Sequence, residues 1–364
     1  MILFGGQSAE HEVSCTTAAH VAAAVDPDRY EVAAIGIAPD GRWSSVDAAA
    51  QLADLRTREL PLRLDPAGPP TEPSAALTAA VGGTTTDEIG DLVVLPLLHG
   101  PMGEDGTMQG LLELADLPYV GSGVLGSAVA MDKSMARELL AAHGLPQTPG
   151  RTILAHEIPK VDAAELFAEL GPVVFVKPAN MGSSIGISRV DDPTDLAAAL
   201  EFAATYDERI VVDASAVDHR EIEFAVLGNA SDGDELRVSV PGEIVPGAAF
   251  YDYEDKYDDG ADLLIPAPLP DDAVAEMTEL ARRAYRVLRC DGMARVDFLW
   301  EDPAVGGRGP LINEVNTIPG FTPISMYPKM WAATGLAYPD LIDELAQLAL
   351  RRHRAKSTHR RTSR

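Results

Sequence analysis

Two segments near the end of the chain, each with polar and apolar residues in alternation, restrict the possible fold most. Residues 293–300 (MARVDFLW) follow a period of two, which predicts a strand with Arg295 and Asp297 on the same face. Residues 310–316 (PLINEVN) place Glu314 and Asn316 on one face in the same way. The connector EDPAVGGRGP is rich in turn-forming residues, so we expect an antiparallel hairpin whose polar pairs lie side by side.

The polar face of this hairpin has two interpretations. Carboxylates brought together on one face repel each other unless a cation lies between them. Asp297, Glu314 and Asn316 offer hard oxygen ligands of the kind that Mg²⁺ prefers, commonly shared with nucleotide phosphates. The alternative is a polar face turned to solvent, because the apolar residues of the other face would pack in either case.

The first part of the chain alternates buried strands with helices. Residues 1–6, 31–38 and 91–100 are apolar almost throughout, and a helical stretch covers residues 15–25. Residues 48–87 show no clear period and are expected to form surface helix and loop. This alternation predicts a parallel, doubly wound sheet, and we place a boundary near residue 130.

Shorter strands and capped helices follow. Residues 152–155, 172–179 and 187–190 predict a smaller sheet, with helices that begin at Asp132 and Asp192. A second boundary is expected near residue 208, beyond which strands and helices alternate again to about residue 350. Residues 351–364 contain seven Lys or Arg and no acid, which predicts a basic, disordered tail; a binding arm is the alternative.

A lysine followed by a Gly- and Ser-rich stretch predicts an anion site. Lys177 ends an apolar strand in FVKPANMGSSIGIS, and backbone N–H groups of the following loop can surround an anion. Such a loop alone is more often a turn. Together with Lys177 and the metal ligands predicted downstream, it favours nucleotide binding.

Two further stretches are candidates for a lid and a substrate site. Residues 248–270 form a long irregular segment with Lys256 and Tyr257 at its centre, as expected of a lid. His99 directly follows a buried strand, the place where open α/β sheets bind ligands. Glu10 lies in the polar stretch GGQSAEHEVS; the alternatives are a structural histidine and a solvated acid.

Composition excludes several classes of protein. A net charge of −27 argues against a nucleic-acid partner, and 46% apolar residues are typical of a globular protein. No apolar run approaches the roughly 20 residues that a membrane span needs. Cys15 and Cys290 are too few for a disulfide framework, and the start lacks an export signal, so we expect a cytoplasmic protein.

Eight motifs in sequence order resemble the D-alanine–D-alanine ligases of the ATP-grasp superfamily: GGQSAEHEVS, HGPMGEDGTMQG, MDKSMAR, FVKPANMGSSIGIS, REIEFAVLGN, FYDYEDKY, MARVDF and INEVNTIPGFTPISMYP. The resemblance implies a three-domain α/β ATP-grasp fold. Its N-terminal doubly wound parallel sheet (1–130) would bind substrate, and the α+β central (131–208) and C-terminal (209–350) domains would grip ATP. It also implies a homodimer that joins two D-alanines through D-alanyl phosphate for peptidoglycan precursor synthesis.

The resemblance also implies residue roles. The ATP-binding residues would be Lys133, Lys177, Ser183, Ser184, Asp213, Ala216, Glu221 and Lys256. Two Mg²⁺ (or Mn²⁺) ions would be held by Asp297, Glu314 and Asn316. Glu10 would anchor the first D-alanine through a chain with Ser183 and Tyr257, His99 would lie beside it, Arg295 and Gly320 would form the oxyanion clamp, and Ser325 and Met326 would hold the second D-alanine.

The sequence departs from the family pattern near the adenine site. The segment DASAVDHRE, which begins at Asp213, is one residue longer than the family's hinge, so the register of the backbone from Asp213 to Ala216 stays open. Alternatives to the main interpretation are D-lactate or D-serine as second substrate, another ATP-grasp carboxylate–amine ligase, and an inactive nucleotide-binding regulator. The last is disfavoured because Arg295, Asp297, Glu314 and Asn316 are all present.

Overall fold

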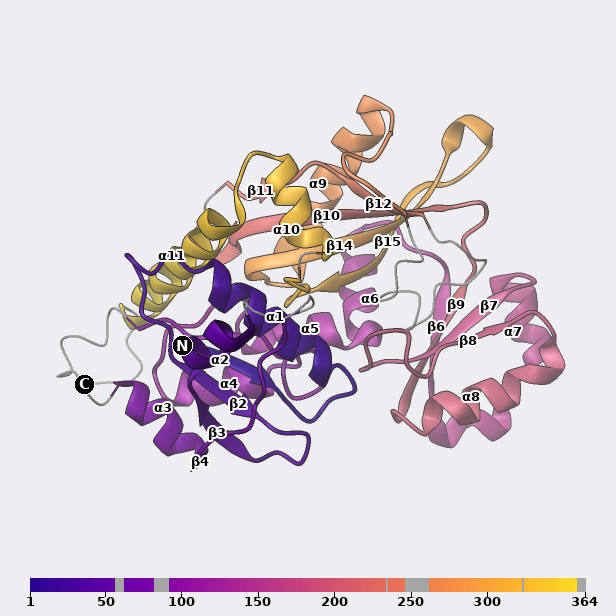
Figure 1. The fold of residues 1–364 in the computed structure, drawn as a ribbon. Coiled ribbons are helices and arrows are strands. Elements are labelled where there is room, and N and C mark those ends of the chain that lie inside the picture. The colour runs from indigo at the N-terminus through magenta and orange to yellow at the C-terminus, as the bar shows by residue number, and fades with distance from the viewer. Residues whose placement is uncertain (56–61, 82–91, 234, 246–261, 323, 359–364) are drawn as a thin grey trace.

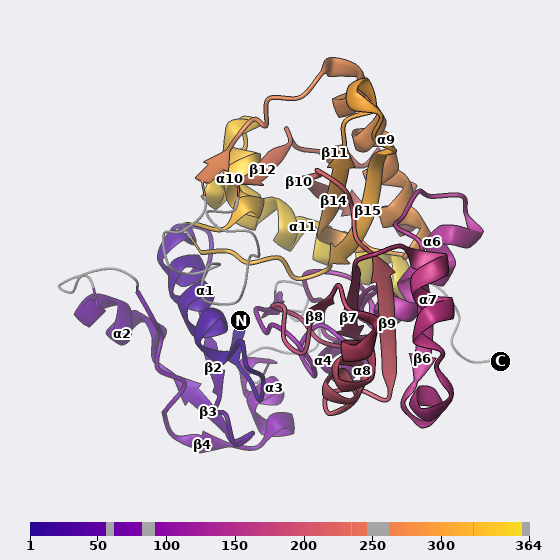
Figure 2. The same cartoon turned by 90° about the vertical axis from the view of Figure 1, so that its right-hand side faces the viewer.

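The computed structural model describes residues 1–55, 62–81, 92–233, 235–245, 262–322 and 324–358. Three sheet-containing units surround a common centre (Figures 1 and 2). The N-terminal unit is drawn in indigo and purple, the central unit in magenta and rose, and the C-terminal unit in orange and yellow.

The N-terminal unit contains a five-stranded sheet in the order β4-β3-β2-β1-β5. Its strands are β1 (Ile2–Gly5), β2 (Ala34–Ile37), β3 (Trp43–Val46), β4 (Pro70–Thr71) and β5 (Leu95–Pro96). Its helices are α1 (His11–Ala24), α2 (Ala48–Leu55), α3 (Pro73–Val81) and α4 (Thr107–Leu114).

The predicted parallel pairing holds for β2, β1 and β5, whereas β3 and β4 run antiparallel at one edge. The reason is the turn that follows β2, in which the Ala38 N–H donates to the Arg42 carbonyl at 2.8 Å and Gly41 has a φ of +85°. Five residues are too few for the crossover that a parallel strand requires, so the chain returns as a hairpin.

The central unit is a four-stranded antiparallel sheet in the order β6-β9-β7-β8. Its strands are β6 (Gly150–Leu154), β7 (Val174–Pro178), β8 (Ser188–Val190) and β9 (Arg209–Ala214). Helices α7 (Ala163–Leu170) and α8 (Leu196–Ala204) and short 3-10 turns η2 (Ala155–Lys160) and η3 (Pro193–Asp195) cover it.

The position of β9 corrects the predicted boundary at residue 208. This strand lies between β6 and β7, inside the central sheet, so the break between the units falls after it, at residues 215–219. The boundaries at residues 130 and 350 stay predictions.

The C-terminal unit has six strands, in the order β13-β12-β10-β14-β15 with β11 beside β10. They are β10 (Arg220–Asn229), β11 (Arg237–Val238), β12 (Gly242–Val245), β13 (Asp262–Leu264), β14 (Asp291–Glu301) and β15 (Gly309–Asn316). The β14–β15 pair confirms the predicted hairpin. Short 3-10 turns are η4 (Ala230–Asp232) and η5 (Pro303–Val305).

Helices cover both faces of this sheet. On one face, Ile222, Val296 and Phe298 form a buried core with α9 (Asp271–Val287). On the other, helices α10 (Met326–Ala333) and α11 (Tyr338–Ser357) pack on β10 and continue into the core of the N-terminal unit. Helices α5 (Val124–Met131) and α6 (Lys133–Ala142) connect the N-terminal and central sheets.

Helix α11 corrects the prediction of a disordered tail from residue 351. Arg352 is only 4% exposed, and its Nη2 donates to the Tyr119 carbonyl at 3.0 Å while its Nη1 donates to the Gly121 carbonyl. Lys356 pairs with Glu113. From sequence alone, a run of basic residues resembles a solvated tail. The carbonyl acceptors that bury Arg352 lie more than 200 residues earlier in the chain, so the local sequence does not reveal them. Residues 359–364 lie outside the described part.

Cys15 and Cys290 are both buried and free, in agreement with the expected absence of disulfides. Among the helices that the structure describes, none has both the length and the apolar composition needed to cross a membrane.

Candidate active site

One large cavity, of about 1070 Å³, opens where the three units meet. Residues from all three units line it. Every predicted site residue within the described ranges is among them: Glu10, His99, Lys133, Lys177, Ser183, Ser184, Asp213, Ala216, Glu221, Arg295, Asp297, Glu314, Asn316, Gly320, Ser325 and Met326. The predicted lid residues Lys256 and Tyr257 lie outside the described residues.

The β14–β15 hairpin supplies the polar floor of the cavity. Arg295 pairs with Asn316 and Asp297 pairs with Glu314, so all four side chains share one face. A bulge follows Asp297, because Phe298 pairs with Ile312 and the intervening residue of β15 has no partner. The bulge changes the register of β15, which lets Ile312 stay in the core while Glu314 faces the cavity.

Arg295 is held between two carboxylates. Its Nε and Nη2 donate to Asp297 at 2.7 and 2.6 Å, and its Nε lies 3.1 Å from Glu223 Oε1. Burial disfavours the guanidinium charge, but these two carboxylates more than offset that cost and hold the pKa of Arg295 well above its ordinary value. Sequence reasoning missed Glu223, although the period of two in REIE places it on the same face as Glu221.

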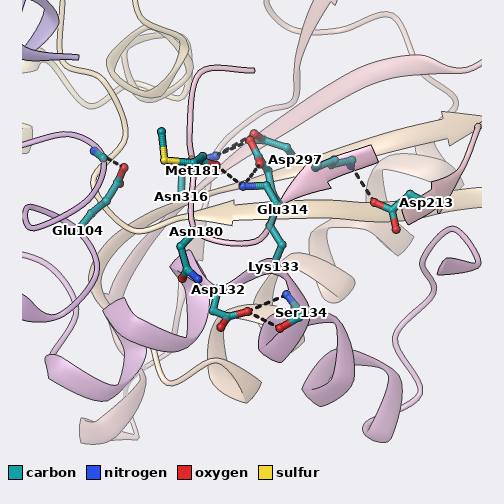
Figure 3. A network of polar contacts seen from close by, with 12 residues as sticks. Glu104, Asp132, Lys133, Ser134, Asn180, Met181, Asp213, Asp297, Glu314 and Asn316 are labelled. Atoms are coloured by element: carbon teal, nitrogen blue, oxygen red, sulfur yellow. Dashed lines mark hydrogen bonds and ion pairs between the residues drawn. The ribbon is translucent and has the colours of Figure 1, made fainter. Parts of the chain in front are cut away.

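Lys133 connects the loop after β7 with the polar cluster on the hairpin, as Figure 3 shows. Its Nζ donates to the Met181 carbonyl at 2.6 Å and lies 3.9 Å from Glu314 Oε2. The preceding residue, Asp132, caps α6 by accepting from the N–H groups of Ser134 and Met135. This cap fixes the first turn of α6 and so directs Lys133 into the cavity.

Asn316 completes the cluster on the hairpin. Its Nδ2 donates to Asp297 Oδ2 at 3.0 Å and to Glu314 Oε1 at 3.4 Å. The donor set of two carboxylates and a carboxamide oxygen fits Mg²⁺. No group of three or more His, Cys, Asp or Glu side chains is arranged for a metal within the described ranges.

Lys177 pairs with Asp213 across neighbouring strands. The Nζ of Lys177 lies 2.8 Å from Asp213 Oδ2, and Arg137 Nη1 lies 2.9 Å from Asp213 Oδ1. Two cations therefore share one buried carboxylate, which leaves excess positive charge beside the cavity. Asp213 was predicted as a nucleotide contact; in this structure its side chain orients Lys177, and Arg137 is a residue that sequence reasoning missed.

The loop after β7 approaches the N-terminal unit closely. Ser183 and Ser184 both have positive φ values, +50° and +58°, which curve the loop over the cavity. The Ser183 hydroxyl donates to Glu10 Oε1 at 2.5 Å. A Cβ on Gly182 would lie 3.1 Å from Glu10 Oε2, so only glycine leaves the carboxylate its room. The predicted link between Glu10 and Ser183 is present.

Two titratable groups of the N-terminal unit face Glu10. Burial lowers the pKa of His99 despite the nearby Glu10 carboxylate. Burial, together with the charge of Glu10, raises the pKa of Glu104 to about 8. The Gly100 N–H donates to Glu104 Oε1 at 2.8 Å. Glu104 was not singled out, although it lies in the motif HGPMGEDGTMQG that supplied His99.

Gly320 and Ser325 lie together at the start of α10. A Cβ on Gly320 would lie 2.8 Å from Ser325 Oγ, so a larger residue would displace that hydroxyl. Ser325 Oγ accepts from the Thr322 N–H at 3.0 Å and precedes the first turn of α10. The Met326 side chain is buried in the core, and the residue lies at the edge of the cavity.

Comparisons with known proteins agree along nearly the whole chain. The D-ala D-ala ligase N-terminus model matches residues 1–122 and the D-ala D-ala ligase C-terminus model matches residues 139–347. The chain is 50% identical to a D-alanine–D-alanine ligase of Kineococcus radiotolerans, over 96% of each chain. It is 44% identical to one of Shouchella clausii, over 97% of this chain and 94% of the relative.

Solved structures of this kind have the same fold. The D-alanine-D-alanine ligase from Coxiella burnetii superposes with a TM-score of 0.78 at 34% identity, over 98% of this chain and 95% of that one. The VanG D-Ala:D-Ser ligase from Enterococcus faecalis also gives 0.78, at 32% identity over 96% and 98%. These likenesses confirm the predicted α/β ATP-grasp fold.

Proposed function

Because the chain belongs to the D-alanine–D-alanine ligase family, we propose that it joins two D-alanines to D-alanyl-D-alanine, with ATP converted to ADP and phosphate, for peptidoglycan precursor synthesis. The observation that carries the proposal is the cavity in which lysines, a cluster of carboxylates and a carboxamide, and further polar groups from three units converge. Phosphoryl transfer depends mainly on positioning and charge neutralisation, and this cavity offers both.

The nucleotide would lie between the central and C-terminal sheets. Lys133 and Lys177 would bind its phosphates, and the Ser183–Ser184 loop would cover them. Asp297, Glu314 and Asn316 would hold the two Mg²⁺ (or Mn²⁺) ions, which neutralise phosphate charge when bound. Lys133 Nζ lies 3.9 Å from Glu314 Oε2, so the proposed phosphate and metal sites are adjacent, as a metal shared with the phosphates requires.

The first chemical step activates the first D-alanine. Glu10, oriented by the Ser183 hydroxyl, would bind the ammonium group, with His99 beside it. The D-alanine carboxylate attacks the γ-phosphorus of ATP, so that D-alanyl phosphate and ADP form. Lys256 and Tyr257 would belong to a lid that keeps water from this acyl-phosphate.

The second step forms the peptide bond. The amine of the second D-alanine, after losing a proton, attacks the acyl carbon, and phosphate leaves. Arg295 and the Gly320 N–H would stabilise the tetrahedral oxyanion. The N-terminus of α10 at Ser325 and Met326 would bind the second carboxylate, because the backbone N–H groups and the dipole of a helix N-terminus favour an anion.

We propose action in the cytoplasm and a homodimeric assembly, as the family implies. The two domains that bind the nucleotide would be the central unit and the C-terminal unit, the latter extending to about residue 350. Residues 1–130 would form the domain that binds substrate.

The direct test is incubation with ATP, Mg²⁺ and D-alanine, followed by measurement of phosphate release and dipeptide. Parallel reactions replace the second substrate with D-serine or D-lactate, since one structural relative is a D-Ala:D-Ser ligase. Dipeptide from D-alanine alone is the expected result. Product only with D-serine or D-lactate would reject the substrate assignment, and no ADP formation with any of them would reject the ligase.

A further inference from the structure

The connection between the central and C-terminal sheets is a five-residue hinge, residues 215–219, between β9 and β10. Ala216, which is 7% exposed, lines the cavity from this hinge. The next N–H group, that of Val217, points to a side chain elsewhere: it donates to Glu301 Oε1 at 2.8 Å. Glu301 ends β14, so the tip of the hairpin holds the hinge.

Glu301 is itself fixed by Arg308, which lies across the turn at the start of β15. Arg308 donates from its backbone N–H and its Nε to Glu301 Oε2, at 3.1 and 2.7 Å, and from Nη2 to Oε1. With the Val217 N–H, four donors surround one carboxylate that is 3% exposed. A carboxylate so surrounded has a single position, and the hinge N–H that it binds is therefore fixed as well.

The hinge lies where the base of a nucleotide is expected. Lys177 would mark the phosphate region, and the half-buried apolar residues Phe175 and Leu299 line the same cavity. Apolar surface of this kind suits a purine ring, and Ala216 of the hinge lines the same cavity. The polar edge of the ring would then meet the hinge backbone.

We propose that the Glu301–Arg308 pair is a positioning element for the nucleotide base, which sets the hinge backbone at the distance that adenine requires. The inference rests on the proposed ATP-dependent function. Neither residue is among those that line the cavity, so both act through Val217 and its neighbour Ala216.

A fixed hinge would also affect which purine base the protein prefers. Adenine presents an amino donor and a ring-nitrogen acceptor on the edge where guanine presents a carbonyl acceptor and an N–H donor. A fixed backbone distinguishes the two patterns, whereas a backbone free to shift loses part of that discrimination. The pair therefore governs both the affinity for ATP and the preference for ATP over GTP.

The test uses the full chain with Glu301→Leu, which removes the acceptor of the Val217 N–H, and Glu301→Gln, which keeps an acceptor without the charge. We expect Glu301→Leu to raise KM for ATP about tenfold, with Glu301→Gln about threefold, and KM for D-alanine within about twofold of the parent. The ratio of kcat/KM for ATP over GTP should fall in the same order.

The matched control is Glu113→Gln, which breaks a different ion pair, with Lys356, and neither residue of that pair lines the cavity. It should leave the ATP/GTP ratio unchanged. Should Glu301→Leu fail to fold, Arg308→Lys replaces it, because one point charge cannot reproduce the two-atom contact.

Two results would overturn the proposal. One is a lower thermal midpoint of the Glu301 variants with unchanged KM for ATP and an unchanged ATP/GTP ratio. The other is an equal rise of KM for ATP and for D-alanine. Binding of ADP, measured by calorimetry, separates this proposal from the proposed function: a parent protein that binds ADP but forms no dipeptide rejects the ligase and still tests the hinge.

Discussion

The two ends of the β14–β15 hairpin carry the same kind of contact and use it differently. At one end Arg295 donates two hydrogen bonds from its side chain to Asp297, and at the other end Arg308 donates two from its side chain to Glu301. Asp297 faces the cavity and also accepts from Asn316, whereas all four donors around Glu301 belong to the turn and the hinge. The first carboxylate can exchange partners when a ligand enters, but the second cannot without moving the backbone.

The surrounding charges explain the difference. Near Arg295, the carboxylates of Glu223, Asp297 and Glu314 outnumber the guanidinium, and a second positive group has room to approach from the cavity. Near Arg308, one carboxylate meets one guanidinium and the charges are balanced. An excess of acid at one end and neutrality at the other separate a binding site from a structural joint.

The largest effect is expected for Arg295→Ala, which should lower kcat for dipeptide about 10²- to 10³-fold through loss of an oxyanion donor. The variant also leaves Glu223 and Asp297 facing each other without their cation, so the second variant Arg295→Ala/Glu223→Gln relieves that repulsion. Steady-state kinetics and calorimetric ATP binding check the result. Loss of ATP affinity in the double variant would contradict the oxyanion role.

Asp297→Asn should come next, with an apparent Mg²⁺ requirement raised about a hundredfold, because a charged ligand becomes neutral. The comparison is sharpened by Glu301→Gln, which should leave the Mg²⁺ requirement unchanged. Both are measured by titrating Mg²⁺ at saturating ATP. An equal shift in the two variants would show that the two ends are not functionally distinct.

Arg308→Leu should lower the free energy of unfolding by about 2 kcal/mol. Breaking a fully buried ion pair costs more, but the Arg308 side chain is 40% exposed and solvent screens part of the interaction. Urea unfolding at neutral pH measures the loss. Recovery of stability in Arg308→Leu/Glu301→Leu, where no charge is left buried, is the check on this explanation.

Glu104, near the cavity end of the hairpin, should make the free energy of unfolding depend on pH around neutrality. Its pKa is raised from 4.5 to about 8, so the folded protein holds a proton there that the unfolded chain releases. Stability should therefore decrease as the pH rises from 4.5 to 8. Glu104→Gln should flatten this part of the stability profile; an unchanged slope would assign it to other groups.

Glu301, at the hinge end of the hairpin, should make the free energy of unfolding change with pH in the opposite direction, at acidic pH. The hydrogen bonds from Arg308, acting against burial, lower the pKa of Glu301 from 4.5 to about 2. Its contribution is present above pH 4.5 and is lost as the pH falls toward 2, with a size on the order of 1 kcal/mol because Arg308 is partly exposed. Urea unfolding between pH 3 and pH 6 should show a shallower decline for Glu301→Gln than for the parent.

The hairpin could be predicted because its determinants are local. A period of two fixes which side chains share a face, and a turn-rich connector fixes the pairing, so Arg295, Asp297, Glu314 and Asn316 were placed together from sequence. Glu223 was missed because its contact with Arg295 depends on the register between β10 and β14, which lie some 70 residues apart.

The errors share a cause. The boundary at residue 208 was wrong because an apolar strand such as β9 fits either sheet, and only its pairing with β6 and β7 decides. The tail from residue 351 was taken as solvated because burial of Arg352 requires acceptors at Tyr119 and Gly121. A sequence pattern indicates which residues will be buried, but it does not indicate which distant strand or acceptor they will contact.

The contacts of α11 also constrain the order in which the protein can assemble. Asp343 pairs with Arg29, and Arg352 fills a place between the carbonyls of Tyr119 and Gly121, so the N-terminal unit receives part of its packing from the far end of the chain. During synthesis the ribosome releases the N-terminal unit first, while α11 is not yet made. That unit therefore stays incompletely packed until translation has passed Arg352. During this interval its apolar surface is exposed, and binding by a chaperone would protect it most from aggregation.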